Sequence, residues 1–133
     1  MSRYLLDTNH AGTLLRDENA PLWHRLRPLG RTECVLCRPV VAELWFMVFN
    51  SARVESNRAK LESLLAQFDV AEFDAIAAVE FGRIRAELRR AARPIPIFDI
   101  LIASIARSNG LTVVTSDAHF AAVERLASEN WLE

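Results

Sequence analysis

Lysine, cysteine and glycine are all scarce in this sequence of 133 residues, which contains one lysine, two cysteines and four glycines. Two cysteines cannot build the multi-disulfide framework of a small secreted domain, so we expect the apolar core to stabilise the fold. The net charge of −1 excludes a global basic field that would draw the whole molecule onto a nucleic acid or a membrane. Any contact with a polyanion must therefore come from a local patch, for which the plentiful arginines are suited.

Long apolar runs are also missing. The longest run of large apolar side chains covers residues 44–49, far below the roughly 20 residues that a membrane-spanning helix requires. The first residues do not form a signal peptide, so we expect a cytoplasmic protein without a membrane anchor. With 51% apolar and 25% charged residues, the chain is typical of one globular domain, expected over residues 1–133.

Strand-like and helix-like segments alternate along the chain. Short apolar strands are predicted at 4–6, 34–37, 70–73 and 111–114, with a further edge strand at 131–132. Helices are predicted at 9–15, 21–29, 39–50, 56–68, 74–92, 97–107 and 117–127. This alternation predicts an α/β fold in which a central, mostly parallel sheet of four to five short strands has helices on both faces.

Four acidic residues fall at the ends of strands or near the beginnings of helices. Asp7 follows the first predicted strand, and Asp117 follows the strand that ends at residue 114. Glu43 and Asp99 lie near the beginnings of two helices. Because the carboxyl ends of parallel strands share one edge of a sheet, where ligands bind, we expect these carboxylates to converge if the right strands are neighbours.

The surroundings of these acids point to a bound cation. Glu43 and Asp99 stand among large apolar residues, and no lysine or arginine lies at helical pairing distance in the same segments. A buried carboxylate is costly unless it is paired, capped or bound to a metal, and clustered carboxylates repel one another. An all-oxygen ligand set favours Mg²⁺, or Mn²⁺ in its place, over zinc. Such a site favours hydrolysis of phosphodiesters.

Simple helix capping is the alternative interpretation of three of the acids. Asp7 and Asp117 each suit an N-cap, and Asp99 could complement a helix dipole. Capping is compatible with metal binding, so the two interpretations stay open for each residue. Glu43 has no cap to make, because it is predicted inside a helix. The joint pattern of the four acids therefore carries the hypothesis.

Four stretches, at residues 4–9, 43–44, 94–103 and 114–120, together resemble the PIN-domain ribonucleases, in particular the VapC-like toxins of type II toxin–antitoxin pairs. They read YLLDTN, EL, PIPIFDILIA and VTSDAHF, and the resemblance extends from residue 3 to residue 120 in order and spacing. The sequence departs from the family at Met47, where a small residue is usual, and at Ala92, where glycine is usual.

The resemblance implies a magnesium-dependent endoribonuclease that cleaves structured RNA, such as tRNA or rRNA, and so inhibits translation. It implies a homodimer that a cognate antitoxin protein inhibits. Asp7, Glu43, Asp99 and Asp117 would be the catalytic and metal-binding acids. The residues that would orient this acidic site are Thr8, Asn9, Thr115 and Ser116.

Arg85, Arg89 and Arg93 recur every fourth residue along the longest predicted helix. They could form a track for RNA phosphates, or they could be an ordinary solvated helix face. The helix at 39–50 is apolar on all sides, so we expect one face to be covered by the core and the other by a second copy or a partner.

Three further interpretations remain to be weighed. Cys34 and Cys37 could be half of a zinc site, but no second pair and no suitably spaced histidine completes it, so two buried strand cysteines are the better account. A haloacid-dehalogenase-like phosphatase also begins with a strand and an aspartate, but it needs a second aspartate where this chain has Asn9. A PIN-like module that binds RNA or a partner without cleaving is the rival from a different class.

Overall fold

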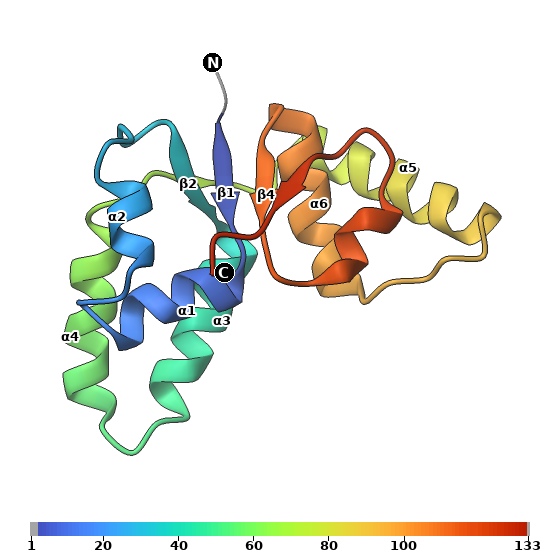
Figure 1. Cartoon of the computed structure of the whole chain (residues 1–133). Coiled ribbons are helices and arrows are strands. Elements are labelled where there is room, and N and C mark those ends of the chain that lie inside the picture. Colours follow the sequence, from blue (N-terminus) through green and yellow to red (C-terminus); the bar gives the residue numbers. More distant parts are fainter. Residues whose placement is uncertain (1–2, 133) are drawn as a thin grey trace.

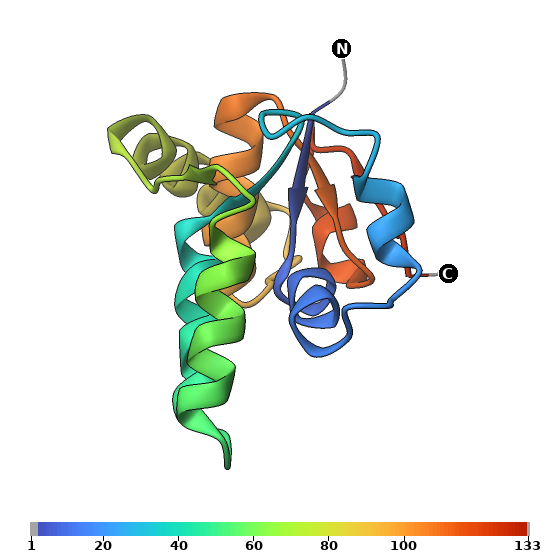
Figure 2. The ribbon, with the colours of Figure 1, turned by 90° about the vertical axis from the view of Figure 1, so that its left-hand side faces the viewer.

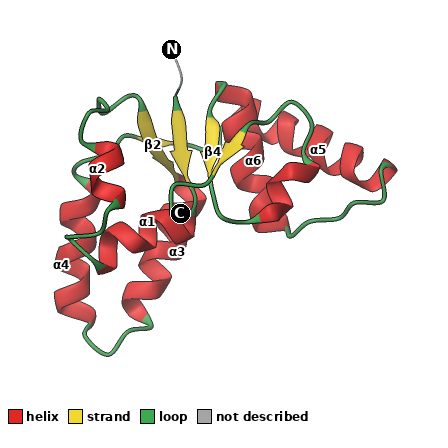
Figure 3. Ribbon diagram, in the orientation of Figure 1, coloured by secondary structure: helices red, strands yellow, loops and turns green. Residues whose placement is uncertain are grey.

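A five-stranded sheet lies at the centre of the computed structural model, which describes residues 3–132 (Figures 1 and 3). The elements in chain order are β1 (Tyr4–Leu6), α1 (Thr8–Arg16), α2 (Leu22–Leu26), β2 (Cys34–Cys37), α3 (Arg38–Phe49), α4 (Val54–Leu65), β3 (Val70–Ala71), α5 (Ala75–Arg90), α6 (Ile97–Asn109), β4 (Thr112–Val114), the 3₁₀ helix η1 (Ala118–Ala122) and β5 (Ser128–Glu129). The strand order is β3-β2-β1-β4-β5, and every neighbouring pair is parallel. The predicted α/β class and parallel sheet are therefore confirmed.

β1 holds the central place in the sheet and determines where a ligand can bind. The chain moves from β1 to β2 and β3 on one side, and then crosses to β4 and β5 on the other side. Leu6 pairs with Val114, so β1 and β4 end at the same level. A crevice outside the carboxyl ends of strands at such a change of direction is the usual ligand site of an open α/β sheet.

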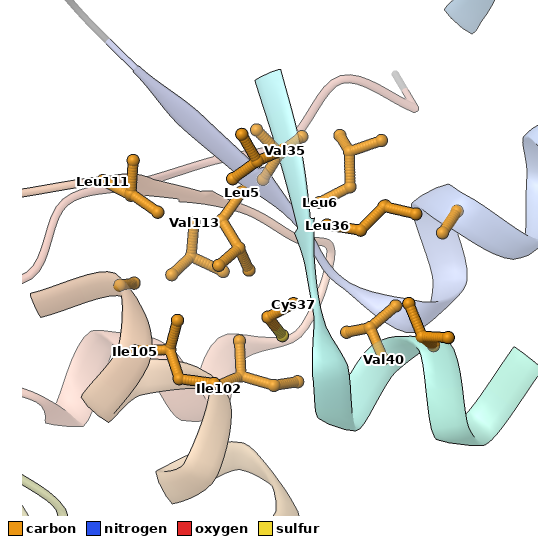
Figure 4. Packing of buried hydrophobic residues seen from close by; sticks show 14 of the residues in the cluster. Leu5, Leu6, Val35, Leu36, Cys37, Val40, Ile102, Ile105, Leu111 and Val113 are labelled. Carbon is orange, nitrogen blue, oxygen red and sulfur yellow. The ribbon is translucent and has the colours of Figure 1, made fainter. Parts of the chain in front are cut away.

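The two faces of the sheet are covered by different helices. Leu5 and Val113 lie on the side of Ile102 and Ile105 from α6, whereas Leu6 and Leu36 lie on the opposite side (Figure 4). Figure 2 shows α5 and α6 on one side of the sheet and α1 and α2 on the other, with α3 and α4 side by side. Because both faces are buried at the centre of the sheet, β1, β2 and β4 are mostly apolar instead of alternating with polar residues, whereas the edge strand β5 is polar and exposed.

Arg107, near the end of α6, ties α5 to α6. Its side chain is only 6% exposed, and it donates to Glu80 at 2.6 Å and to Glu87 at 2.9 Å, both on α5. It also donates to the backbone oxygen of Glu124, at 3.1 Å. One guanidinium group therefore joins α5, α6 and the segment that follows η1.

Two predicted elements near the end of the chain are wrong. The helix expected at 117–127 is only the short 3₁₀ helix η1, because Val123 is extended and Arg125 adopts a left-handed φ of 55°. The edge strand expected at 131–132 is instead β5, at Ser128–Glu129, and Trp131 packs its ring against Tyr4 with a centroid distance of 4.8 Å. α2 is also shorter than the expected 21–29.

Ala92 ends α5 in a conformation that glycine adopts more easily. Its φ is 55°, and the amide of Arg93 donates to the carbonyl of Leu88 at 3.0 Å, as in a Schellman cap. A left-handed residue with a Cβ costs about 1–2 kcal/mol. The departure from the glycine that the resembling family prefers at this position therefore carries a cost in stability.

We expect Ala92→Gly to raise the free energy of unfolding by about 1 kcal/mol, because it relieves the left-handed strain. Urea denaturation of both proteins measures the change. Ala91→Gly is the matched control, since Ala91 has a right-handed φ of −82° and should gain nothing. An equal response of the two variants would contradict the strain at Ala92.

Cys34 and Cys37 are buried free thiols at the two ends of β2. Residues three apart in a strand point to opposite faces, so the pair cannot share one metal ion. Burial raises the pKa of each thiol to about 12, which keeps both uncharged. The structure therefore favours the core interpretation over a zinc site.

Within residues 3–132, no helix has the length and apolar character needed to cross a lipid bilayer.

Candidate functional site

Asp7 lies directly after β1 and begins α1. Its backbone amide donates to the carbonyl of Val114 at the end of β4, at 3.0 Å. Its side chain caps α1, because Oδ1 accepts from the amide of His10 at 3.0 Å. Asp7 is nevertheless only 5% exposed, which is unusual for an N-cap at a surface. The capping interpretation holds, but it does not explain why this carboxylate is buried.

Thr115 joins Asp7 to Asp117. Its hydroxyl donates to Oδ2 of Asp7 at 2.6 Å and accepts from the backbone amide of Asp117 at 2.9 Å. Asp117 in turn caps η1 through a hydrogen bond from the amide of His119, at 2.8 Å. Because β1 and β4 are neighbours, residues more than 100 positions apart in the chain meet at one edge of the sheet.

Asp99 enters the same site from the first turn of α6. Its Oδ2 lies 2.8 Å from Nδ1 of His119, and the same nitrogen lies 3.0 Å from Oδ1 of Asp117. One ligand atom from each of Asp99, Asp117 and His119 can be chosen so that all lie within 4.8 Å of one another. The imidazole of His119 therefore bridges two carboxylates from different elements.

The carboxylates influence one another electrostatically. Burial raises the pKa of Asp99 above its usual range, and the charges of Asp117 and Asp7 raise it further, against the lowering effect of the hydrogen bond with His119. The hydrogen bond with Asp99 raises the pKa of His119, and both carboxylate charges add to this effect. The negative charges of Asp7 and Asp117 therefore make ionisation of Asp99 less favourable, although the three acids come from distant segments of the chain.

Glu43 lies in the second turn of α3 and is half-buried. Its side chain forms no hydrogen bond or ion pair with the residues that the structure describes. The structure therefore brings together Asp7, Asp99 and Asp117, whereas the role of Glu43 in the same site stays a prediction.

The other residues expected to orient the site differ in their surroundings. Thr115 makes the contacts described above. Thr8 follows Asp7, and its hydroxyl oxygen is buried without a hydrogen-bond partner among residues 3–132. Asn9 and Ser116 are exposed. An orienting role has direct support in hydrogen bonds for Thr115 alone.

The predicted arginine stripe is shorter than its spacing indicates. Arg85 and Arg89 are exposed on α5, but Arg93 follows the helix because α5 ends at Arg90. Arg85 and Arg89 line a groove together with Ile95 and Ile97, in the segment that leads to the first turn of α6. The groove therefore lies beside the segment that carries Asp99.

His10 is the residue of this site that the sequence did not suggest, whereas His119 can be interpreted from the sequence either as a general base near Asp117 or as a residue in the first turn of a surface helix. His119 stands two positions after Asp117, and the 3₁₀ turn of η1 places Nδ1 of His119 3.0 Å from Oδ1 of this capping aspartate. His10 stands three positions after Asp7, the spacing of a capped first turn. A histidine three residues after a capping aspartate is the signal in the sequence that points to His10.

The donor atoms of this site fit a hard divalent cation. Carboxylate oxygens outnumber the single imidazole nitrogen, and the pKa of Asp99 is raised first by burial and further by the negative charges of Asp117 and Asp7. Mg²⁺ and Mn²⁺ prefer such oxygen-rich sets, whereas zinc prefers nitrogen and sulfur. Asp7, Asp99 and Asp117 are therefore suited to hold the ion, with His119 within reach.

Comparisons with known proteins agree with this geometry. A family model described as the PIN domain matches residues 4–126. The tRNA(fMet)-specific endonuclease VapC of Shigella flexneri is 35% identical over 132 residues, which cover 98% of this chain and 99% of that protein. Both similarities include the segments that contribute Asp7, Asp99 and Asp117.

Solved structures are similar over almost the full chain. DNA-bound VapBC from Salmonella typhimurium matches with a TM-score of 0.90 and 30% identity, covering 98% of this chain and 99% of that one. VapBC-5 from Mycobacterium tuberculosis, a member of the VapBC family of toxin–antitoxin systems, matches with a TM-score of 0.74 and 26% identity, over 98% and 99% of the two chains. The fold is thus similar to that of chains in VapBC structures from two bacteria.

Proposed function

Because the chain belongs to the PIN domain family and to the VapC ribonucleases within it, we propose that it is a magnesium-dependent endoribonuclease. The observation that carries this proposal is the meeting of Asp7, Asp99 and Asp117 at the carboxyl ends of β1 and β4. The proposed site of action is the cytoplasm. A phosphatase of the haloacid-dehalogenase type finds no support in these relatives.

The side chains of the site would have different roles in the proposed reaction. Asp7, Asp99 and Asp117 would hold the divalent ion, and Glu43 would complete the acidic set. The bound ion would lower the pKa of a coordinated water and neutralise charge on the phosphate under attack. Thr115 fixes Asp7 and the backbone of Asp117 in one arrangement, so the carboxylates need little reorganisation when the substrate arrives.

The proposed substrate is structured RNA, such as tRNA or rRNA. One relative is named a tRNA(fMet)-specific endonuclease, which supports a tRNA substrate for this chain. The groove that Arg85 and Arg89 line runs beside the segment that leads to Asp99 and offers positive charge for a phosphate backbone. Arg93 follows in the same exposed region and would extend this contact.

The proposed partners are a cognate antitoxin and a second copy of the chain. The similarity to VapBC complexes, one of them described as toxin–antitoxin, supports the antitoxin. Phe46 and Phe49 on α3 are 61% and 56% exposed, and exposed aromatic side chains of this size are typical of interfaces. The apolar outer face of α3 therefore supports the predicted protein contact.

Magnesium-dependent cleavage of RNA by the purified chain is the test of this function. Total RNA incubated with the protein and Mg²⁺ should yield discrete fragments, and EDTA should abolish them until Mg²⁺ is restored in excess. Binding of RNA without cleavage, at any concentration of Mg²⁺ or Mn²⁺, would instead support the non-catalytic PIN-like module. The Asp99→Asn variant serves as the control for contaminating nucleases.

We expect Arg89→Glu to weaken RNA binding about tenfold or more and to reduce the salt dependence of binding, because a phosphate contact becomes a repulsion. Fluorescence anisotropy with a labelled RNA, at several salt concentrations, measures both quantities. Arg27→Glu is the matched control, since Arg27 is exposed on the segment after α2 and does not line this groove. Equal affinities of the two variants would mean that Arg89 lies on an ordinary solvated face.

A further inference from the structure

His10 is a fully buried histidine between the acidic site and the segment after β5. Its side chain is 0% exposed. Nδ1 lies 3.1 Å from Oδ1 of Asp7, and Nε2 lies 3.2 Å from the backbone nitrogen of Trp131. One ring therefore connects the beginning of α1 to a residue 121 positions later in the chain.

The contact with Trp131 determines which nitrogen of His10 carries the proton. A backbone N–H can only donate, so Nε2 must accept and cannot itself be protonated. The ring is then neutral, with its proton on Nδ1, and that N–H donates to Oδ1 of Asp7. The second contact of a histidine commonly fixes its tautomer in this way.

These hydrogen bonds leave Asp7 one position for a ligand. Oδ1 accepts twice from His10, through the backbone amide and through Nδ1–H. Oδ2 accepts once, from the hydroxyl of Thr115. A carboxylate has about four lone-pair positions, so the remaining one is on Oδ2. Rotation of the carboxylate would break all three bonds, which keeps Oδ2 directed away from His10.

We propose that His10 is a positioning residue, which holds Asp7 so that Oδ2 alone coordinates the divalent ion, and which is itself held in the required tautomer by the backbone of Trp131. This inference rests on the proposed function, because it takes Asp7 as a metal ligand. Partners that orient a ligand without touching the metal typically change metal affinity or activity about 10- to 100-fold when they are replaced. The segment after β5 is then part of the support of the site.

Two substitutions, His10→Asn and His10→Gln, distinguish the roles of the two ring nitrogens of His10. The amide nitrogen of asparagine can take the place of Nδ1 and donate to Asp7, whereas the longer glutamine reaches the position of Nε2 and leaves Asp7 without its donor. His24→Asn is the matched control, because His24 is exposed on α2 and, among residues 3–132, its side chain forms a hydrogen bond only with Arg27. The measurements are Mn²⁺ affinity by calorimetry, RNA cleavage as kcat and KM separately, and the ¹⁵N shifts of His10 in the wild type.

We expect the wild-type spectrum to show the Nδ1–H tautomer of His10. We expect His10→Gln to weaken Mn²⁺ binding about 10- to 100-fold and to lower kcat with little change in KM, while His10→Asn recovers most of both. A purely structural histidine would instead lower Tm in both variants and leave the Mn²⁺ affinity of the folded protein unchanged.

The proposal is overturned if the proton lies on Nε2, if asparagine and glutamine lose Mn²⁺ affinity equally, or if neither loses any. The ¹⁵N result decides the first point even where a variant fails to fold. Failure of the proposed function has a different signature. A wild-type protein that binds Mn²⁺ but cleaves no RNA would refute the nuclease, while the comparison of the two variants would still decide the role of His10.

Discussion

Asp99→Asn is expected to lower RNA cleavage at least about 1,000-fold, because it removes a carboxylate whose contribution to a bound ion is worth several kcal/mol in the transition state. The same change should raise the Tm of the metal-free protein. The pKa of Asp99 is raised in the folded state, so the folded state disfavours the ionised form. The contribution of Asp99 to the free energy of unfolding therefore falls as the pH rises above the usual pKa of an aspartate. The neutral amide of asparagine avoids that loss of stability at pH 7.

Single-turnover cleavage and a thermal melt in EDTA measure the two parts of this prediction. Glu62→Gln is the matched control, because Glu62 is exposed on α4 and should change neither quantity. A large fall in Tm for Asp99→Asn would mean that the carboxylate is a structural cap, and retained cleavage would remove it from the active site.

Asp7 should not behave like Asp99 in the same experiment, although sequence reasoning treats the two acids alike. The oxygens of Asp7 accept three hydrogen bonds, from the amide and ring of His10 and from Thr115. An asparagine would turn its NH₂ group either toward the two donors of His10, and lose both bonds, or toward Thr115, whose hydroxyl proton would then lose its acceptor. Asp99 is therefore the cleaner position at which to separate catalysis from stability.

Arg107→Met is expected to have the largest effect on stability, a loss of about 2–4 kcal/mol at pH 7, because it leaves Glu80 and Glu87 without their main counter-charge. The hydrogen bonds of Arg107 lower the pKa of both glutamates. The stability that they contribute is thus present above the usual pKa of a glutamate and is lost as the pH falls through the lowered values. The wild type should lose more stability than the variant between pH 7 and pH 3.

Urea denaturation at the two pH values measures this difference. Arg83→Met is the matched control, since Arg83 also pairs with Glu80 but its side chain is 64% exposed, so its loss should cost less than about 1 kcal/mol. Equal losses for Arg83 and Arg107 would show that burial of the guanidinium adds nothing.

The strands, the long helices and the convergence of three acids could be predicted from local sequence. Tyr4–Leu6 and Thr112–Val114 are apolar and short, and the acids that follow them must meet if the two strands pair in parallel. Gly110, with a left-handed φ of 66°, follows the last residue of α6, the position at which glycine commonly ends a helix. In these places local preference and tertiary packing agree.

The wrong or missed features depend on contacts between distant segments. The residues after η1 have helical composition, but pairing of β5 with β4 and the buried ring of Trp131 draw them into an extended path. The contacts of Arg107 to α5 cannot be read from its own helix, and neither can the distance from His119 to Asp99. Glu43 is a similar case, because the apolar residues beside it in the sequence do not show which groups its side chain contacts in the fold.

The long sequence separation within the site also bears on when the protein can act. Asp7 leaves the ribosome early, but Thr115, which donates to its carboxylate, is 108 residues further along the chain, and the backbone of Trp131, which holds His10, is 121 residues beyond that histidine. A growing chain therefore exposes its first acid long before the scaffold around that acid exists. A site built in this way cannot be assembled until translation of the chain is almost complete.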